Sequence, residues 1–190
     1  MFLRSLALTS LFLASHTALA DWQVTSDSRV SFQTIKNTNT MESHTFNKVS
    51  GTLMDSGAAM ISIDLSSVST GIAVRDKRMQ TMLFETSKYA TANFQTMLSK
   101  SVLGDLQAGK TVDFELQGTL ALHGERQRIR TMVKAVPIVD GSIVVTTLAP
   151  FIVEAADFAL VDGINSLREA AGLESITTAV PVSFTLTLSQ

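Results

Sequence analysis

The chain has 190 residues, no cysteine and a formal net charge of −2 at pH 7. The lack of cysteine excludes disulfide bonds and the acylated cysteine of a bacterial lipoprotein. The slightly acidic balance argues against nucleic acid or an anionic membrane surface as the main partner. With 45% hydrophobic and 17% charged residues, the chain has enough apolar side chains for a sizeable core.

The first twenty residues follow the pattern of a cleavable secretory signal. Arg4 precedes an apolar stretch at residues 6–14, and small residues stand directly before Asp21. The apolar stretch is far shorter than the ~20 residues that a membrane-spanning helix needs. We therefore expect residues 1–20 to be a signal peptide that is removed on export, and residues 21–190 to form a single soluble domain.

A series of strands is predicted by apolar side chains that alternate with polar ones. The pattern is clearest at residues 111–122, where only Gly118 interrupts the apolar series, and at 180–189, where Pro181 suits the start of a strand. The predicted strands cover residues 29–36, 50–53, 59–65, 91–98, 111–122, 127–136, 142–148 and 180–189.

Two segments interrupt the strand pattern with helical spacing. Between Ile72 and Phe84 apolar residues recur at roughly helical intervals with basic residues between them, which predicts one amphipathic helix. Residues 162–173 place apolar side chains on one side and end near Gly172, which predicts a second short helix.

The fold class that follows is mostly β with one or two short α-helices. Strands with one solvent-exposed face and one apolar face form sheets whose edge strands must be protected from pairing with other chains. A closed antiparallel barrel has no edge strands. A two-sheet sandwich satisfies the same alternation, so both architectures stay open at this point.

One segment matches the phosphate-binding P-loop expression. It is GDLQAGKT at residues 104–111. A P-loop needs a helix after the glycine-rich loop, but the clearest predicted strand follows this one. We therefore interpret the segment as a hairpin turn and expect no nucleotide.

Three stretches resemble the YceI-like family, in matching order and spacing along nearly the whole of residues 21–190. They are FNKVSGTL at 46–53, IDLSSVSTGIAVRDKRMQTMLFETSKYATANF at 63–94, and LQGTLALHG at 116–124. The resemblance implies an extended, lipocalin-like antiparallel β-barrel, exported to the periplasm, that holds a long isoprenoid or fatty-chain lipid in an apolar interior.

The sequence departs from the family pattern at several places. Arg78 stands where many members have histidine, and LFET at residues 83–86 replaces a DFFD-like stretch. The helical segment at 162–173 is an addition near the C-terminus. This resembles a subgroup with a C-terminal helical insertion.

The candidate ligand-binding residues are apolar side chains of the strands and the first helix, with two basic residues of that helix. Each apolar residue could equally fill the core, since small barrels are either packed or hollow. The two arginines could meet an anionic head group or lie on a solvated face, Arg75 pairing with Asp76 or Glu85. The set is Phe32, Met79, Met82, Phe84, Phe94, Phe114, Phe184, Arg75 and Arg78.

Positive signals for catalysis are lacking. His44 and His123 stand in unrelated contexts without metal-ligand spacing, and we expect the ring of His123 to hydrogen-bond neighbouring backbone. Glu154 and Asp157 resemble solvated charges. No cofactor, metal or enzymatic activity is expected.

Three functions stay open, with a carrier of an apolar lipid first. A barrel filled by side chains that serves as an interaction or stress-response accessory is the second, and an enzyme acting on such lipids is the third. Transient contact with a membrane or a membrane protein is compatible with all three. The sequence leaves the oligomeric state open.

Overall fold

The structure, a computed structural model, describes residues 21–190. The predicted signal peptide, residues 1–20, lies outside the described residues. Across 21–190, none of the helices combines the length and the apolar character needed to cross a membrane.

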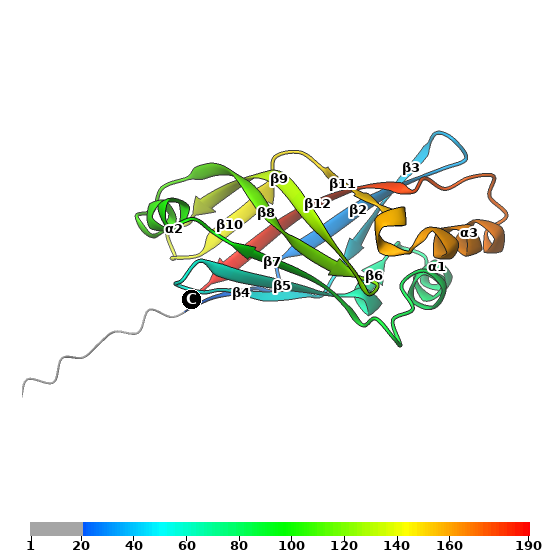
Figure 1. The fold of residues 1–190 in the computed structure, drawn as a ribbon, viewed down its shortest axis with the longest axis horizontal. Coiled ribbons are helices and arrows are strands. Elements are labelled where there is room, and N and C mark those ends of the chain that lie inside the picture. The colour runs from blue at the N-terminus through cyan, green and yellow to red at the C-terminus, as the bar shows by residue number, and fades with distance from the viewer. Residues whose placement is uncertain (1–20) are drawn as a thin grey trace, which may run out of the picture.

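Antiparallel strands make up about half of the described chain (Figure 1). The strands are β1 (Trp22–Val24), β2 (Arg29–Lys36), β3 (Thr40–Phe46), β4 (Val49–Leu53), β5 (Ala58–Asp64), β6 (Val68–Ser69), β7 (Thr91–Met97), β8 (Val112–Leu122), β9 (Glu125–Pro137), β10 (Ile143–Thr147), β11 (Phe151–Glu154) and β12 (Ala179–Ser189). The helices are α1 (Ala73–Arg78), which a π-helix, Met79–Leu83, continues, α2 (Lys100–Gln107) and α3 (Val161–Ala170), with short 3-10 turns at Leu65–Ser67 and Ala155–Phe158.

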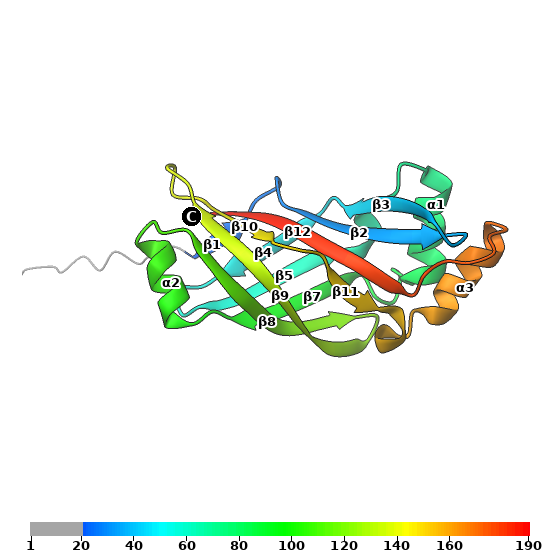
Figure 2. The same ribbon diagram turned by 90° about the horizontal axis from the view of Figure 1, so that it is seen from above.

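The strands close into an eight-stranded barrel. β1, β4, β5, β7, β8, β9, β10 and β12 pair in that order, and β12 pairs again with β1. β12 runs along the barrel between the ends at which α2 and α3 lie (Figure 2). Its first half pairs with β11 and β2, and its second half pairs with β10 and β1. The prediction of a lipocalin-like barrel is confirmed, and the ring of pairings excludes the sandwich.

All eight predicted strands are present, within two residues at each end. The sequence patterns did not find β1, β3, β6 and β11. Three of these are short, and β3 is polar along most of its length, with Glu42 and His44 on the same face as Phe46. A strand whose inward face carries charged groups gives no apolar alternation to detect.

The predicted hairpin turn at residues 104–111 is wrong. The chain forms helix α2 after Ser99, whose hydroxyl accepts a hydrogen bond from the Val102 amide at 3.2 Å. Leu103 and Leu106 of this helix are buried at one end of the barrel. In a P-loop a strand precedes the glycine-rich loop and a helix follows it. Here helix α2 precedes Gly109 and strand β8 follows it, so the order is reversed.

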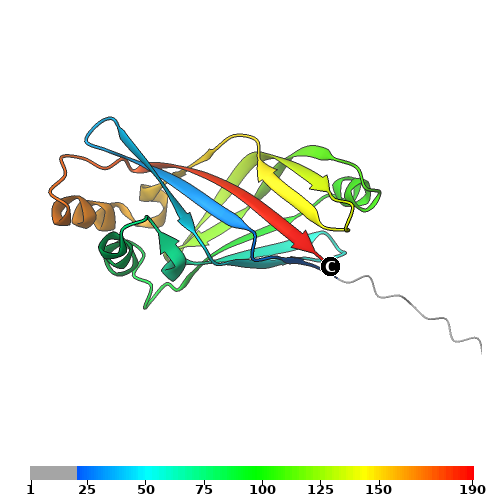
Figure 3. The same cartoon turned by 180° about the vertical axis from the view of Figure 1, so that it is seen from behind.

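Helices α1 and α3 lie together at the opposite end of the barrel from α2 (Figure 3). α3 confirms the predicted second helix and packs on the π-helix that follows α1, where Gly163 lies against the backbone of Met82 and Leu83. A side chain at position 163 would overlap that backbone. The close approach of these segments brings the C-terminal helix over this end of the barrel.

A candidate ligand-binding tunnel

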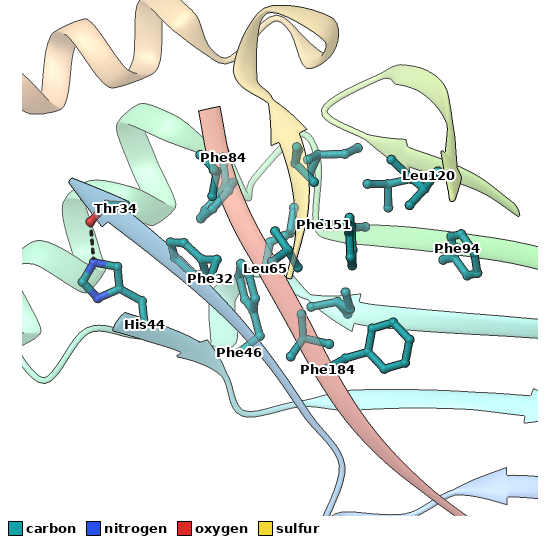
Figure 4. Close-up of a pocket in the computed structure, with 18 of the residues that line it drawn as sticks. Phe32, Thr34, His44, Phe46, Leu65, Phe84, Phe94, Leu120, Phe151 and Phe184 are labelled. Atoms are coloured by element: carbon teal, nitrogen blue, oxygen red, sulfur yellow. Dashed lines mark hydrogen bonds between the residues drawn. The ribbon is translucent and has the colours of Figure 1, made fainter. Parts of the chain in front are cut away.

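A cavity of about 620 Å³ runs through the barrel interior. It reaches from residues beside α1 to residues beside α2, and its wall is almost entirely apolar. Pockets for small molecules and cofactors usually measure ~300–1,000 Å³. We call this cavity the tunnel; Figure 4 shows the phenylalanine side chains that converge in part of it.

Several inward side chains in the middle of the barrel border open space. Phe94, Phe114, Leu120 and Phe184 line the tunnel and are only half-buried, although they point away from bulk solvent. Most of the fully buried apolar side chains form two clusters, and half-buried Val49 and Phe184 contact both, while buried Leu116 and Val133 belong to neither. A barrel filled by its own side chains would also bury Phe94, Phe114, Leu120 and Phe184 fully.

Buried side chains line one end of the tunnel. Around α2 they include Leu53, Leu106 and Ile143, beside half-buried Ala59 and Leu98. At the other end, Ile72 and Val74 line the tunnel while 48% and 59% of their surface is exposed, and Ala170 and Ala171 are exposed across from them. The mouth of the tunnel therefore lies between the start of α1 and the end of α3.

Eight of the nine sequence-predicted binding residues line the tunnel. They are Phe32, Arg75, Arg78, Met79, Phe84, Phe94, Phe114 and Phe184. Their part in binding stays a prediction.

Met82 does not line the tunnel. An α-helix would place residues 79, 82 and 83 on one face, but this segment is a π-helix, in which the Phe84 amide donates to the Met79 carbonyl at 2.9 Å. The wider turn aligns Met79 with Leu83 and Phe84 and moves Met82 off that face. The placement of Met82 by helical spacing is thus corrected.

A cluster of charged groups borders the tunnel near its mouth. Glu42 of β3 accepts hydrogen bonds from Arg75 at 2.8 Å and lies 3.1 Å from the Lys36 ammonium. Arg75 also donates to the Thr70 carbonyl at 2.7 Å. The expected pairing of Arg75 with Asp76 or Glu85 is wrong, because Asp76 accepts from the backbone amide of Thr70 instead.

The charge state of Glu42 follows from these contacts. Burial by itself raises the pKa of Glu42, but the hydrogen bonds and positive charges of Arg75 and Lys36 outweigh it and lower the pKa below its usual value. Glu42 is therefore a carboxylate at neutral pH.

His44 lies beside this cluster and is almost completely buried, with 3% of its surface exposed. Its Nε2 atom is 3.0 Å from the Thr34 hydroxyl, as Figure 4 shows, and its ring packs on Phe32 at a centroid distance of 5.2 Å. Burial, followed by the charge of Arg75, lowers the pKa of His44 below 6.5. The ring is neutral at pH 7.

His123 lies outside the tunnel wall, in the two-residue turn between β8 and β9. Its Nε2 atom contacts a Glu85 carboxylate oxygen at 2.9 Å and its ring stacks with Tyr89 at 4.4 Å, so the expected bond to neighbouring backbone is wrong. Glu154 and Asp157 are exposed and also lie outside the tunnel wall. Within residues 21–190, no group of three or more histidine or acidic side chains is placed to hold a metal ion.

Sequence patterns missed several tunnel residues, chiefly those of β3 and β11. Glu42, His44 and Phe46 are spaced two residues apart, as side chains on one face of a strand are. This spacing was the available signal for a strand, but only one of the three residues is apolar. Phe151 belongs to a four-residue strand that is too short for periodicity to show.

A closed antiparallel barrel around an apolar tunnel defines a lipocalin-like binding fold. The model of the YceI-like domain matches residues 22–188, and the chain belongs to the YceI-like family. The comparison with curated proteins found no match.

Solved structures show the same architecture. A polyisoprenoid binding domain from Saccharophagus degradans, implicated in plant cell wall breakdown, is 34% identical over 88% of this chain and 97% of that one, with a TM-score of 0.84. BcnA of Burkholderia cenocepacia is 16% identical over 85% and 96%, with a TM-score of 0.66. A YceI protein of Campylobacter jejuni is 14% identical over 77% and 84%, with a TM-score of 0.56. The last two likenesses concern the fold alone.

Proposed function

We propose that this protein is an exported, soluble carrier or sequestering protein that holds one long apolar lipid, an isoprenoid or a fatty chain, inside the tunnel. The observation that carries the proposal is the continuous apolar tunnel with half-buried walls. The 34% identity to a polyisoprenoid binding domain supports the choice of an isoprenoid.

Affinity in such a site comes from the removal of apolar surface from water. Each Å² of buried apolar surface contributes about 25 cal/mol, in the ligand as in the wall. An apolar wall distinguishes chain length and bulk but offers few directional contacts. The tunnel thus binds a class of chains rather than a single compound.

The two alternative functions have less support. A filled-barrel accessory protein needs inward side chains that occupy the interior, whereas Phe94, Phe114 and Phe184 border open space. An enzyme needs a reactive group aligned with a base and an orienting residue. His44 contacts a threonine hydroxyl and no carboxylate, and His123 lies outside the tunnel wall. We therefore propose binding without covalent chemistry.

Export places such a carrier beside membranes. We propose that residues 1–20 direct the chain to the periplasm, where lipid enters through the mouth between α1 and α3. The exposed apolar side chains of Ile72 and Val74 at that mouth fit transient contact with a membrane or a membrane protein.

A direct test is uptake by delipidated protein of isoprenoid alcohols and fatty acids of increasing chain length. We expect stoichiometric uptake whose affinity rises with chain length until the tunnel is full. Failure to take up any isoprenoid or fatty chain would overturn the proposal.

A further inference from the structure

The polar residues of the tunnel wall gather at one place. Apart from scattered threonines, the charged and imidazole groups that line the tunnel all lie near its mouth, on β2, β3 and α1: Lys36, Glu42, His44, Arg75 and Arg78. The rest of the wall is apolar. A ligand with an apolar chain and one polar end would therefore be oriented with the polar end toward the mouth.

Two buried nitrogen atoms in this cluster have no hydrogen-bond partner within residues 21–190. They are Nδ1 of His44 and Nε of Arg75. A buried polar group without a partner destabilises a protein by about 1–3 kcal/mol, so such groups are rare in the absence of water or ligand. Both residues border the tunnel, although the two nitrogen atoms are themselves covered, so a rotation of the side chain would bring either nitrogen to a polar group bound there.

The free nitrogen of His44 suits an uncharged partner. If the Thr34 hydroxyl donates to Nε2, Nδ1 carries the hydrogen and donates, and in the other tautomer Nδ1 accepts. A neutral imidazole can thus bond a carbonyl or a hydroxyl. It adds no positive charge to attract an anion.

Two of the three cationic side chains of the tunnel wall are already paired with a carboxylate. Glu42 binds both Arg75 and Lys36, so a phosphate or carboxylate that approached these cations would meet its carboxylate. Among the cationic residues of the tunnel wall in the described chain, Arg78 alone makes no ion pair. Arg75, one of the two arginines expected to meet an anionic head group, is thus already paired with a carboxylate of β3.

Resting on the proposed function, we propose that His44 is a specificity-determining contact in a subsite, bordered by Thr34 and the Glu42 cluster, for an uncharged hydroxyl or carbonyl head of the bound chain. The subsite gives direction to a tunnel that is otherwise apolar. It selects neutral isoprenoid or fatty-chain lipids over those that end in phosphate or carboxylate.

The test compares three probes of one isoprenoid chain length: the alcohol, the hydrocarbon and the monophosphate. Wild type is expected to bind the alcohol more tightly than the monophosphate. His44→Phe keeps an aromatic ring against Phe32 and removes the nitrogens. It is expected to weaken alcohol binding about 5- to 30-fold and to leave hydrocarbon binding unchanged.

Three further variants sharpen the result. His44→Gln restores a polar group and should recover part of the preference for the alcohol. His123→Phe removes the histidine outside the tunnel and should leave all three affinities unchanged. Glu42→Gln removes the opposing carboxylate and should strengthen monophosphate binding relative to the alcohol.

Equal losses for alcohol and hydrocarbon in His44→Phe would overturn the proposal, because His44 would then act by packing alone. Tighter binding of the monophosphate than of the alcohol by wild type would overturn it as well. If wild type binds none of the three probes and no fatty chain either, the proposed function itself fails, which separates that outcome from a failure of the subsite.

Discussion

Gly118 of β8 lies so close to the ring of Phe94 on β7 that a Cβ atom at position 118 would overlap the ring carbons Cζ and Cε2. It would also meet the carbonyl oxygen of Gln95. The glycine that interrupts the apolar series of this strand thus makes room for an aromatic ring of the tunnel wall.

Gly118→Ala should therefore lower the free energy of unfolding by about 1–3 kcal/mol, since overpacking forces side chains and backbone to shift. Gly104→Ala is the matched control, because within residues 21–190 nothing outside its own stretch of helix α2 lies within 4 Å of the added Cβ. This control should leave stability unchanged or raise it by up to about 1 kcal/mol. Denaturant unfolding measures both, and equal effects would contradict this account of Gly118.

Narrowing of the tunnel should act on ligand size. Leu120 is a half-buried residue of the tunnel wall, and its neighbour Thr119 is exposed on the outer face of β8. Leu120→Trp should abolish the uptake of long chains while short chains still bind, whereas Thr119→Trp should bind both as wild type does. The same uptake in both variants would show that ligand does not occupy the middle of the tunnel.

The position of the mouth predicts a kinetic effect. Val74 is exposed at the tunnel mouth, and Val139 is fully exposed in the hairpin between β9 and β10. Val74→Asp should slow the exchange of ligand with lipid vesicles, because an apolar chain must then pass a charged rim. Val139→Asp should exchange at the wild-type rate. If exchange were slower in Val139→Asp and not in Val74→Asp, the tunnel mouth would have to lie at the other end of the barrel.

Buried His44 makes stability depend on pH. Its pKa in the folded protein is lowered from 6.5, first by burial and then by the nearby charge of Arg75; Lys36 also lowers it, while Glu42 and Asp76 act in the opposite direction. The unfolded chain then binds more protons, so this contribution to stability is complete above about pH 6.5 and is lost as pH falls toward the folded pKa.

Thermal unfolding between pH 7 and pH 5 should thus show a decline in melting temperature that is smaller in His44→Phe. At lower pH, Glu42 adds a second loss, because its pKa is also lowered in the folded state and its stabilising contribution disappears as pH falls below about 4.5. An unchanged slope in His44→Phe would contradict the burial of a neutral ring.

The strands that alternate apolar and polar residues were predictable because one face of each is exposed to solvent, which places polar side chains at every second position. The barrel interior was harder, since Phe94 and Phe184 have the same sequence pattern whether they fill a core or border a tunnel. Sequence periodicity reports which side chains face inward, and it does not report the distance across to the opposite strand.

The polar end of the tunnel could not be predicted for a different reason. Glu42 and Arg75 are 33 residues apart, and they meet only because the barrel brings β3 beside α1. The neighbours of Arg75 in sequence suggested Asp76 and Glu85 as partners, whereas the tertiary contact is with Glu42. Helical spacing also misplaced Met82, since sequence alone did not signal the π-helix.

The most direct test of the central claim is native mass spectrometry of the protein, purified without detergent, followed by identification of any extracted lipid. A protein with an apolar tunnel should carry one long-chain lipid per polypeptide, and Leu120→Trp should lose it while Thr119→Trp keeps it. Wild type that is recovered empty, and that remains empty after incubation with isoprenoid and fatty-chain lipids, would contradict a carrier function.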